Sequence, residues 1–227
     1  MEMDVESVLV ALRKESRKRV RDGMARYAIP SDNALGVSVA DIRALAKRIG
    51  RNHPLALALW KTNIYEARML TAFIADPARV TPAQMDRWAG DFDNWAICDT
   101  LCFHLFDRTP HAWAKIRQWS DDPREFVRRG AFALLASLAL HDKTTGDRPF
   151  LGSLRLIERR AGDDRNFVKK AVSWALRGLG RRNRALNAAA TELARSLSTS
   201  TKPATRWIGK DALKDLTSPA LRRRLRA

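Results

Sequence analysis

The sequence predicts an all-α protein, and two observations carry that prediction. Residues 125–135 (EFVRRGAFALL) and 166–176 (NFVKKAVSWAL) share one pattern 41 residues apart: Phe-Val, two cations, then small or branched apolar residues. No segment shows the sustained period-two alternation between turn signals that is typical of β-hairpins. A helical unit that recurs every ~40–47 residues is typical of HEAT-like helix pairs, which bury their apolar faces against neighbouring pairs. We therefore predict a right-handed α–α superhelix (solenoid) of HEAT-like repeats with a concave basic face.

Helix start and stop signals place the elements in order along the chain. The first helix ends where Pro30 and the polar residues after it interrupt the chain. Ser38 is expected to cap the second helix, with an acidic residue three positions on. Thr81 and Thr109 each precede a proline that suits a first helical position, and Asp93 is expected as another N-cap. The expected helices cover residues 5–26, 38–49, 54–60, 64–75, 81–89, 93–106, 109–119, 123–141, 147–160, 164–181, 184–197 and 203–215.

The length and composition suit one continuous domain. With 227 residues and 45% hydrophobic content, the chain can bury a substantial core. We expect a single HEAT-like repeat domain over residues 1–227, with a divergent N-terminal helical cap over about 1–36, stacked helix pairs over 37–217 and a short basic end over 218–227. A weaker repeat match aligns Trp207 with Phe167, 40 residues earlier.

The charge balance indicates a polyanionic partner. Lys and Arg number 42 against 25 Asp and Glu, so the net charge is +17, which favours nucleic acid. The repeat presents Arg128 and Arg129 again as Lys169 and Lys170, and a row of cations along a concave face suits DNA phosphates. An arginine-rich genome would also produce a basic protein. A membrane surface is less favoured because the charge is spread over many segments.

Several other classes of protein are disfavoured. The chain has no run of eighteen apolar residues and no secretory start, so we expect a cytoplasmic, bacterial-type intracellular protein, nucleoid-associated when bound to DNA. Cys98 and Cys102 are four apart in an expected helix and are interpreted as reduced core thiols. The histidines show no metal-ligand spacing. We expect no metal, no cofactor, no membrane partner and a monomer.

The sharpest local feature is the pair Trp95 and Asp99. On a helix these residues lie one turn apart on the same face. Asp99 falls within an apolar run, where an unpaired carboxylate is costly. Two interpretations stay open: Asp99 pairs with an arginine or the backbone of a neighbouring element, or it faces a cleft and stabilises positive charge in a ligand.

Trp174 departs from the repeat, because its counterpart is Ala133. Lys170, Trp174, Arg177 and Arg181 follow helical spacing and form one face. An aromatic ring flanked by cations is a common way to hold nucleic acid, although a tryptophan packed between repeats is the simpler alternative. The other five tryptophans are expected in the core: Trp60, Trp88, Trp113, Trp119 and Trp207.

Four segments together resemble the DNA alkylation repair proteins of the AlkD-like group, which are HEAT-like repeat DNA glycosylases that remove N3- and N7-alkylated purines. They are residues 94–99 (NWAICD), 126–129 (FVRR), 166–177 (NFVKKAVSWALR) and 206–208 (RWI), and the resemblance covers residues from about 7 to 217. It implies that Trp95, Asp99 and Trp174 form the catalytic cleft and that Arg129 contacts DNA. Active members tend to carry a second aromatic residue where this chain has Asn94.

The resemblance implies a monofunctional glycosylase in base excision repair, acting on double-stranded DNA that contains alkylated bases. The carboxylate of Asp99 suits stabilisation of an oxocarbenium-like sugar, and indole faces add cation–π attraction of ~0.5–2 kcal/mol each. No lysine is placed as an obvious Schiff-base nucleophile, so the product is an abasic site. Two alternatives stay open: a noncatalytic HEAT-repeat protein for damaged or branched DNA, and a protein-interaction scaffold.

Overall fold

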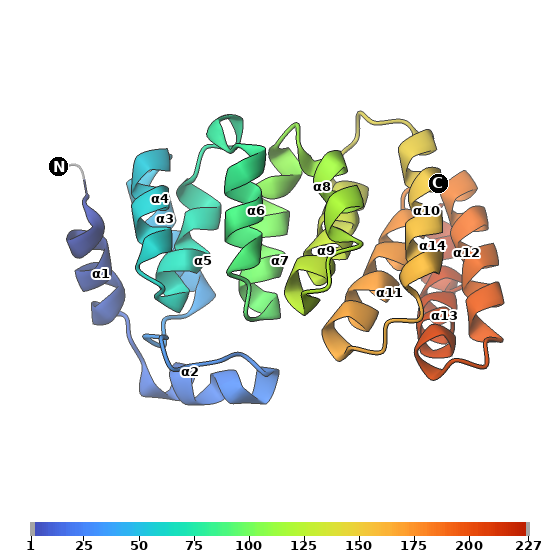
Figure 1. Ribbon diagram of the computed structural model, residues 1–227, viewed down its shortest axis with the longest axis horizontal. Helices are drawn as coiled ribbons and strands as arrows, with labels where there is room; N and C mark the ends of the chain where they lie inside the picture. The colour runs from blue at the N-terminus through green and yellow to red at the C-terminus, as the bar shows by residue number, and fades with distance from the viewer. Residues whose placement is uncertain (1–2, 226–227) are drawn as a thin grey trace. The chain divides into compact units, whose positions relative to one another are not determined.

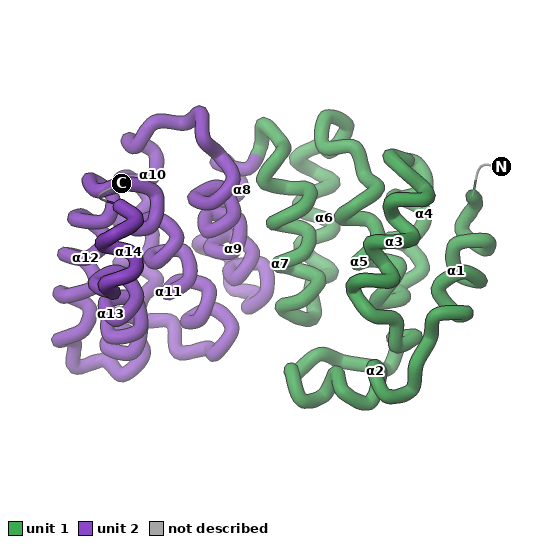
Figure 2. Tube along the Cα trace, turned by 180° about the vertical axis from the view of Figure 1, so that it is seen from behind, with its two compact units in different colours: residues 1–111 green, residues 112–227 purple. Residues whose placement is uncertain are grey.

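The computed structural model describes residues 3–225 and confirms the all-α prediction, since these residues form helices and no strand (Figure 1). The chain divides into two compact units: unit 1 ends at His111 and unit 2 begins at Ala112 (Figure 2). None of the helices in the described part is both long and apolar enough to span a membrane. Each unit is described by itself.

Unit 1 contains seven α-helices and three short 3-10 turns among its described residues. They are α1 (Val5–Lys14), α2 (Lys18–Gly23), η1 (Met24–Tyr27), α3 (Val39–Ile49), α4 (His53–Lys61), α5 (Tyr65–Ile74), η2 (Pro77–Arg79), α6 (Pro82–Gly90), α7 (Trp95–His104) and η3 (Phe106–Arg108). Helices α3, α5 and α7 pack in succession, and α4 packs against α5. Helix α2 lies crosswise to this stack in both views (Figures 1 and 2).

Unit 2 contains the clearest repeats. Its helices are α8 (Ala112–Trp119), α9 (Glu125–His141), α10 (Asp147–Arg160), α11 (Asn166–Gly180), α12 (Arg184–Ser198), α13 (Pro203–Leu216) and α14 (Pro219–Arg224). Helices α9, α11 and α13 form one layer in chain order, and α10 packs against α12 in the other layer. Helix α8 packs against α9, so α9 is covered on two sides and is buried along most of its length. These stacked pairs are the repeats that the sequence predicts.

One turn recurs before α9, α11 and α13. In each case a side-chain oxygen accepts a hydrogen bond from the backbone N–H two residues on, and the helix begins at the following residue. The oxygens belong to Asp122, Asp163 and Ser200. Counted from this start, Arg129, Lys170 and Trp207 are each the fifth residue of their helix. The alignment of Trp207 with Phe167 is therefore wrong, because the connections on both sides of α12 are shorter than those on both sides of α10.

The cap signals were right at two positions and wrong at two. Ser38 and Thr81 each accept the expected backbone hydrogen bond at the start of α3 and α6. Asp93 is not the cap of α7: Asn94 accepts from the backbone N–H of Ile97 at 3.0 Å instead. Thr109 does not begin a helix, since its hydroxyl donates back to a carbonyl in η3, and α8 begins at Ala112. The expected helix over 5–26 is divided into α1, α2 and η1.

A buried carboxylate fixes the segment between η1 and α3. Glu66 on α5 is fully buried, and it accepts backbone hydrogen bonds from Leu35 at 2.8 Å, Gly36 at 2.7 Å and Val37 at 3.1 Å. Gly36 has a φ of +88°, and a Cβ there would lie 2.7 Å from the backbone oxygen of Arg17. Glycine is required at this position because it alone adopts the conformation without strain or a clash. The N-terminal segment is thereby held against the stacked helices.

Glu66→Gln should loosen this segment. The amide group of glutamine turns a donor toward backbone N–H groups, so at least one buried donor loses its partner at a cost of about 1–3 kcal/mol. We expect faster amide hydrogen exchange at residues 35–37 and a lower free energy of unfolding in urea. The matched control is Glu6→Gln, which changes an exposed carboxylate on α1. Equal exchange rates at residues 35–37 in wild type and Glu66→Gln would contradict the assigned role.

Candidate nucleic-acid interface

Trp95 is fixed by a long-range hydrogen bond in unit 1. It is the first residue of α7, directly after the Asn94 cap, and its side chain is half-buried. The indole Nε1 donates to the backbone oxygen of Tyr27 at 2.7 Å. A buried or half-buried indole N–H normally finds such a partner, and the bond then sets the orientation of the ring. Trp95 therefore links α7 to η1.

Tyr27 is a residue of this site that the sequence did not reveal. Its side chain is 66% exposed, the most of any large hydrophobic residue described, and the next residue, Ala28, has a left-handed backbone with a φ of 52°. Tyr27 ends a segment in which Arg19, Arg21 and Arg26 are exposed. An aromatic residue that follows a basic run was the available signal. The hydrogen bond from Trp95 places the backbone of Tyr27 beside the start of α7, and the Tyr27 side chain is exposed there.

Asp99 lies one turn after Trp95 on α7 and is half-buried. Burial raises the pKa of the nearby Cys102 thiol, and Cys98 and then the charge of Asp99 raise it further. Both cysteines are buried as thiols, as the sequence predicts. Asp99 is thus a half-buried acidic residue that acts on the buried Cys102 thiol and lies on the same helical face as Trp95.

Trp174 occupies the predicted face of α11 in unit 2. It is half-buried, whereas its counterpart Ala133 on α9 is fully buried. In α13 the same helical position holds Asp211, whose carboxylate accepts from the Ser173 hydroxyl at 2.5 Å and lies 3.5 Å from Arg177. Arg181 likewise donates from Nε to Asp215 of α13 at 2.9 Å. Two of the predicted DNA-binding cations therefore carry carboxylate partners.

The repeated cations on α9 and α11 lie in different surroundings. Arg129 is only 6% exposed, and its Nη1 donates to the backbone oxygen of Phe167 at 2.8 Å, which joins α9 to α11. Its counterpart Lys170 is exposed. Lys169 is half-buried, with its Nζ 5.1 Å from the ring centroid of Trp207. The repeat therefore conserves the helical position of each cation but not its exposure.

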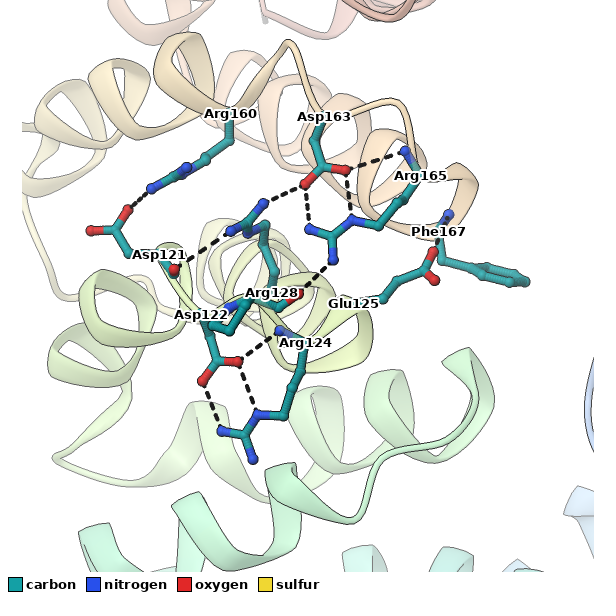
Figure 3. Close-up of polar contacts among 10 residues, drawn as sticks. Asp121, Asp122, Arg124, Glu125, Arg128, Arg160, Asp163, Arg165 and Phe167 are labelled. Carbon is teal, nitrogen blue, oxygen red and sulfur yellow. Dashed lines mark hydrogen bonds and ion pairs between the residues drawn. The ribbon is translucent and has the colours of Figure 1, made fainter.

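Arg128 belongs to a polar network at the start of α9 and α11 (Figure 3). Asp163, with a side chain only 6% exposed, accepts from Arg128 at 2.6 Å and from Arg165 at 2.9 and 2.6 Å. Asp122 accepts from Arg124 in the same way, at 2.9 and 2.7 Å. Figure 3 also shows Asp121 with Arg160 and Glu125 with the backbone N–H of Phe167. This network ties the two repeats together.

Asp163 is ionised in this setting despite its burial. Burial works to raise its pKa, but the donors of Arg165 and Arg128 outweigh burial and hold the pKa of Asp163 at about 2. The guanidinium groups of Arg128 and Arg165 are consequently held by the charged Asp163 carboxylate. Arg128 is thus a structural cation in this structure, and its predicted contact with DNA stays a prediction.

The predicted site residues are distributed over both units. Unit 1 brings together Trp95, Asp99 and the unexpected Tyr27, while unit 2 carries Trp174 and the predicted cations. The convergence of Trp174 with Trp95 and Asp99 stays a prediction. Within residues 3–225, no group of three or more His, Cys, Asp or Glu side chains is placed to hold a metal ion.

The stacked helix pairs define a HEAT-like helical-repeat protein. Residues 8–216 match the family described as DNA alkylation repair enzyme, and the chain belongs to that family. No curated protein matches the chain. A solved structure described as a new family of proteins related to the HEAT-like repeat DNA glycosylases, with affinity for branched DNA structures, aligns with a TM-score of 0.77 and 19% identity over 92% of this chain and 94% of that chain. A designed armadillo repeat protein aligns with a TM-score of 0.43 and 14% identity over 94% of this chain and 95% of that chain.

Asp163→Asn should destabilise unit 2. The folded pKa of Asp163, about 2, lies below its ordinary value of 3.8, so its charge stabilises the fold above about pH 4 and the contribution is lost as the pH falls toward 2. We expect the variant to lower the free energy of unfolding by about 2 kcal/mol at neutral pH, with a smaller difference from wild type near pH 2. Urea unfolding across this pH range measures both. Asp164→Asn, an exposed neighbour, should change stability little. Equal losses in the two variants would contradict this role.

Proposed function

We propose that the protein is a monofunctional DNA glycosylase that excises cationic N3- and N7-alkylpurines from double-stranded DNA and leaves an abasic site. The observation that carries this proposal is the pair on α7: a half-buried carboxylate, Asp99, one turn from an indole, Trp95, whose orientation is fixed by the Tyr27 carbonyl. The pair belongs to a chain of net charge +17 in a DNA repair enzyme family.

The chemistry requires little beyond these groups. An alkylated purine already carries positive charge, so its bond to the sugar is weak and the base leaves as a neutral molecule. Departure of the base leaves an oxocarbenium-like sugar, which the Asp99 carboxylate stabilises while it orients the attacking water. The faces of Trp95 and Trp174 attract the cationic base and sugar. The water supplies the hydroxyl group that replaces the base, and its other proton passes to the Asp99 carboxylate and then to solvent.

The cations of unit 2 would hold the DNA backbone. Lys170 is exposed, and Arg177 and Arg181 carry carboxylate partners on α13. Ion pairs near the surface contribute about 0–1 kcal/mol each, so these arginines can exchange a carboxylate for a phosphate at small cost. Arg129 and Arg128 would act from the first turns of α9, and Lys169 from α11.

A second function is favoured by the position of Asn94. Its side chain is 1% exposed and caps α7, so it offers no surface to a nucleotide where active relatives tend to carry an aromatic residue. This favours a protein that binds damaged or branched DNA without releasing a base. The solved relative described as having affinity for branched DNA structures shares the fold.

Release of an alkylated base by wild type distinguishes the two functions, and Asp99→Asn tests the role of the carboxylate. The glycosylase proposal expects wild-type protein to release 7-methylguanine or 3-methyladenine from methylated DNA. Loss of an electrostatic stabiliser should raise the barrier by about 2–4 kcal/mol and leave DNA affinity nearly unchanged. Asp164→Asn, which changes an exposed carboxylate away from α7, is the matched control. Release at the wild-type rate by Asp99→Asn would overturn the assigned role, and DNA binding without release by wild type would favour the second function.

Lys170→Gln tests the DNA-holding face. Binding to phosphates releases counterions, so the logarithm of affinity falls with the logarithm of salt concentration by about 0.9 per phosphate contact. We expect Lys170→Gln to reduce this slope for duplex DNA by about one contact. Lys143→Gln, an exposed lysine beyond the C-terminal end of α9, should leave the slope unchanged. An unchanged slope in Lys170→Gln would remove Lys170 from the interface.

A further inference from the structure

Trp207 differs from every other tryptophan of the chain. All seven tryptophans lie in the described residues, and six are buried or half-buried. Trp207, which the sequence places in the core, is 39% exposed. Single exposed apolar side chains are common on protein surfaces, so the place of Trp207 in the repeat and its neighbours carry more information than its exposure alone.

The position of Trp207 in the repeat is informative. It is the fifth residue of α13, where α9 has Arg129 and α11 has Lys170. The same helical position thus holds a cation in two successive repeats and an aromatic ring in the third. Because α13 packs directly on α11, Trp207 extends the series of residues proposed to contact DNA.

The surroundings of Trp207 are cationic. The Nζ of Lys169 lies 5.1 Å from the ring centroid, within the range of a cation–π interaction. Two further lysines are exposed: Lys170, which follows Lys169 in the sequence, and Lys210, one turn after Trp207. The nearest acidic residue along α13 is Asp211, and it already bonds to Ser173 and lies 3.5 Å from Arg177. A polyanion with a flat apolar group fits this surface.

We propose that Trp207 is a stacking platform for an unpaired base, and that the protein prefers DNA in which unpaired nucleotides adjoin a duplex. Sites for single-stranded nucleic acid combine an aromatic face with cations that follow the backbone, and both are present here. Away from the ends of a duplex the base faces are covered by their neighbours, so an indole gains stacking there only where a base is unpaired. This inference rests on the proposed DNA binding and adds the class of DNA structure that is preferred.

The experiment compares two DNAs and three variants. The DNAs are a blunt duplex and the same duplex with a short single-stranded arm, and affinities are measured at one salt concentration. Stacking on one base corresponds to an affinity gain of about fivefold to a hundredfold. We expect Trp207→Ala to lose this factor for the armed DNA and less than about twofold for the blunt duplex. Trp207→Phe should retain most of the affinity. Leu151→Ala, which removes a 40% exposed apolar side chain on α10, is the matched control.

A second readout reports stacking directly. A fluorescent adenine analogue in the single-stranded arm should be quenched on binding wild type and Trp207→Phe, but not on binding Trp207→Ala. If wild type binds the blunt duplex but Trp207→Ala binds and quenches the armed DNA as wild type does, this inference is overturned while the proposed function stands. If wild type binds neither DNA, both fall.

Discussion

Helix α9 shows the constraint on which unit 2 depends: it can form only when its neighbours cover it. Most of its residues are buried, so an isolated helix pair would leave this apolar surface in water. Polar groups then fix how the next repeat is added. Arg129 donates to the Phe167 carbonyl, and Glu125 accepts from the Phe167 N–H. These bonds hold α11 at one register against α9, which is why equivalent helical positions line up.

The excess of positive charge has to be compatible with this packing. Carboxylates in two places pair with arginines and neutralise part of this charge. They are Asp163 in the turn before α11, and Asp211 and Asp215 on α13. Each takes one or two arginines and lets adjacent helices approach without repulsion between their cations. The residual charge is carried by residues such as Lys170 and Lys210, which are exposed and carry the electrostatic attraction for a polyanion.

Local sequence signals predicted where most helices lie. The burial and exposure of individual side chains depend on contacts between repeats, which these signals do not contain. Ser38 caps α3 as expected because an N-cap depends only on residues within one turn. Asp93 and Asn94 are both residue types that favour an N-cap. The structure selects Asn94, because α7 begins at Trp95 and the Asn94 side chain accepts from the Ile97 N–H. The burial of Arg129 depends on its contact with α11, and the exposure of Trp207 depends on the neighbours of α13, the helix that the sequence misaligned by pairing Trp207 with Phe167. The spacing of Trp95 and Asp99 on one helical face could be predicted from the sequence, but the long-range bond from Trp95 to Tyr27 could not.

Tyr27 contributes its backbone oxygen to the contact with α7, so no side-chain motif marks that contact in the sequence. Among the hydrogen bonds that hold the N-terminal segment to the helix stack, two ties use its backbone atoms: Glu66 of α5 accepts from the N–H groups of residues 35–37, and Trp95 of α7 donates to the Tyr27 carbonyl. The Asn33 side chain adds a further bond, to the Asn63 carbonyl. Apart from Gly36, its side chains can therefore change without loss of either tie. Because Tyr27 meets α7 through its backbone oxygen, its exposed side chain can change without loss of the bond to Trp95.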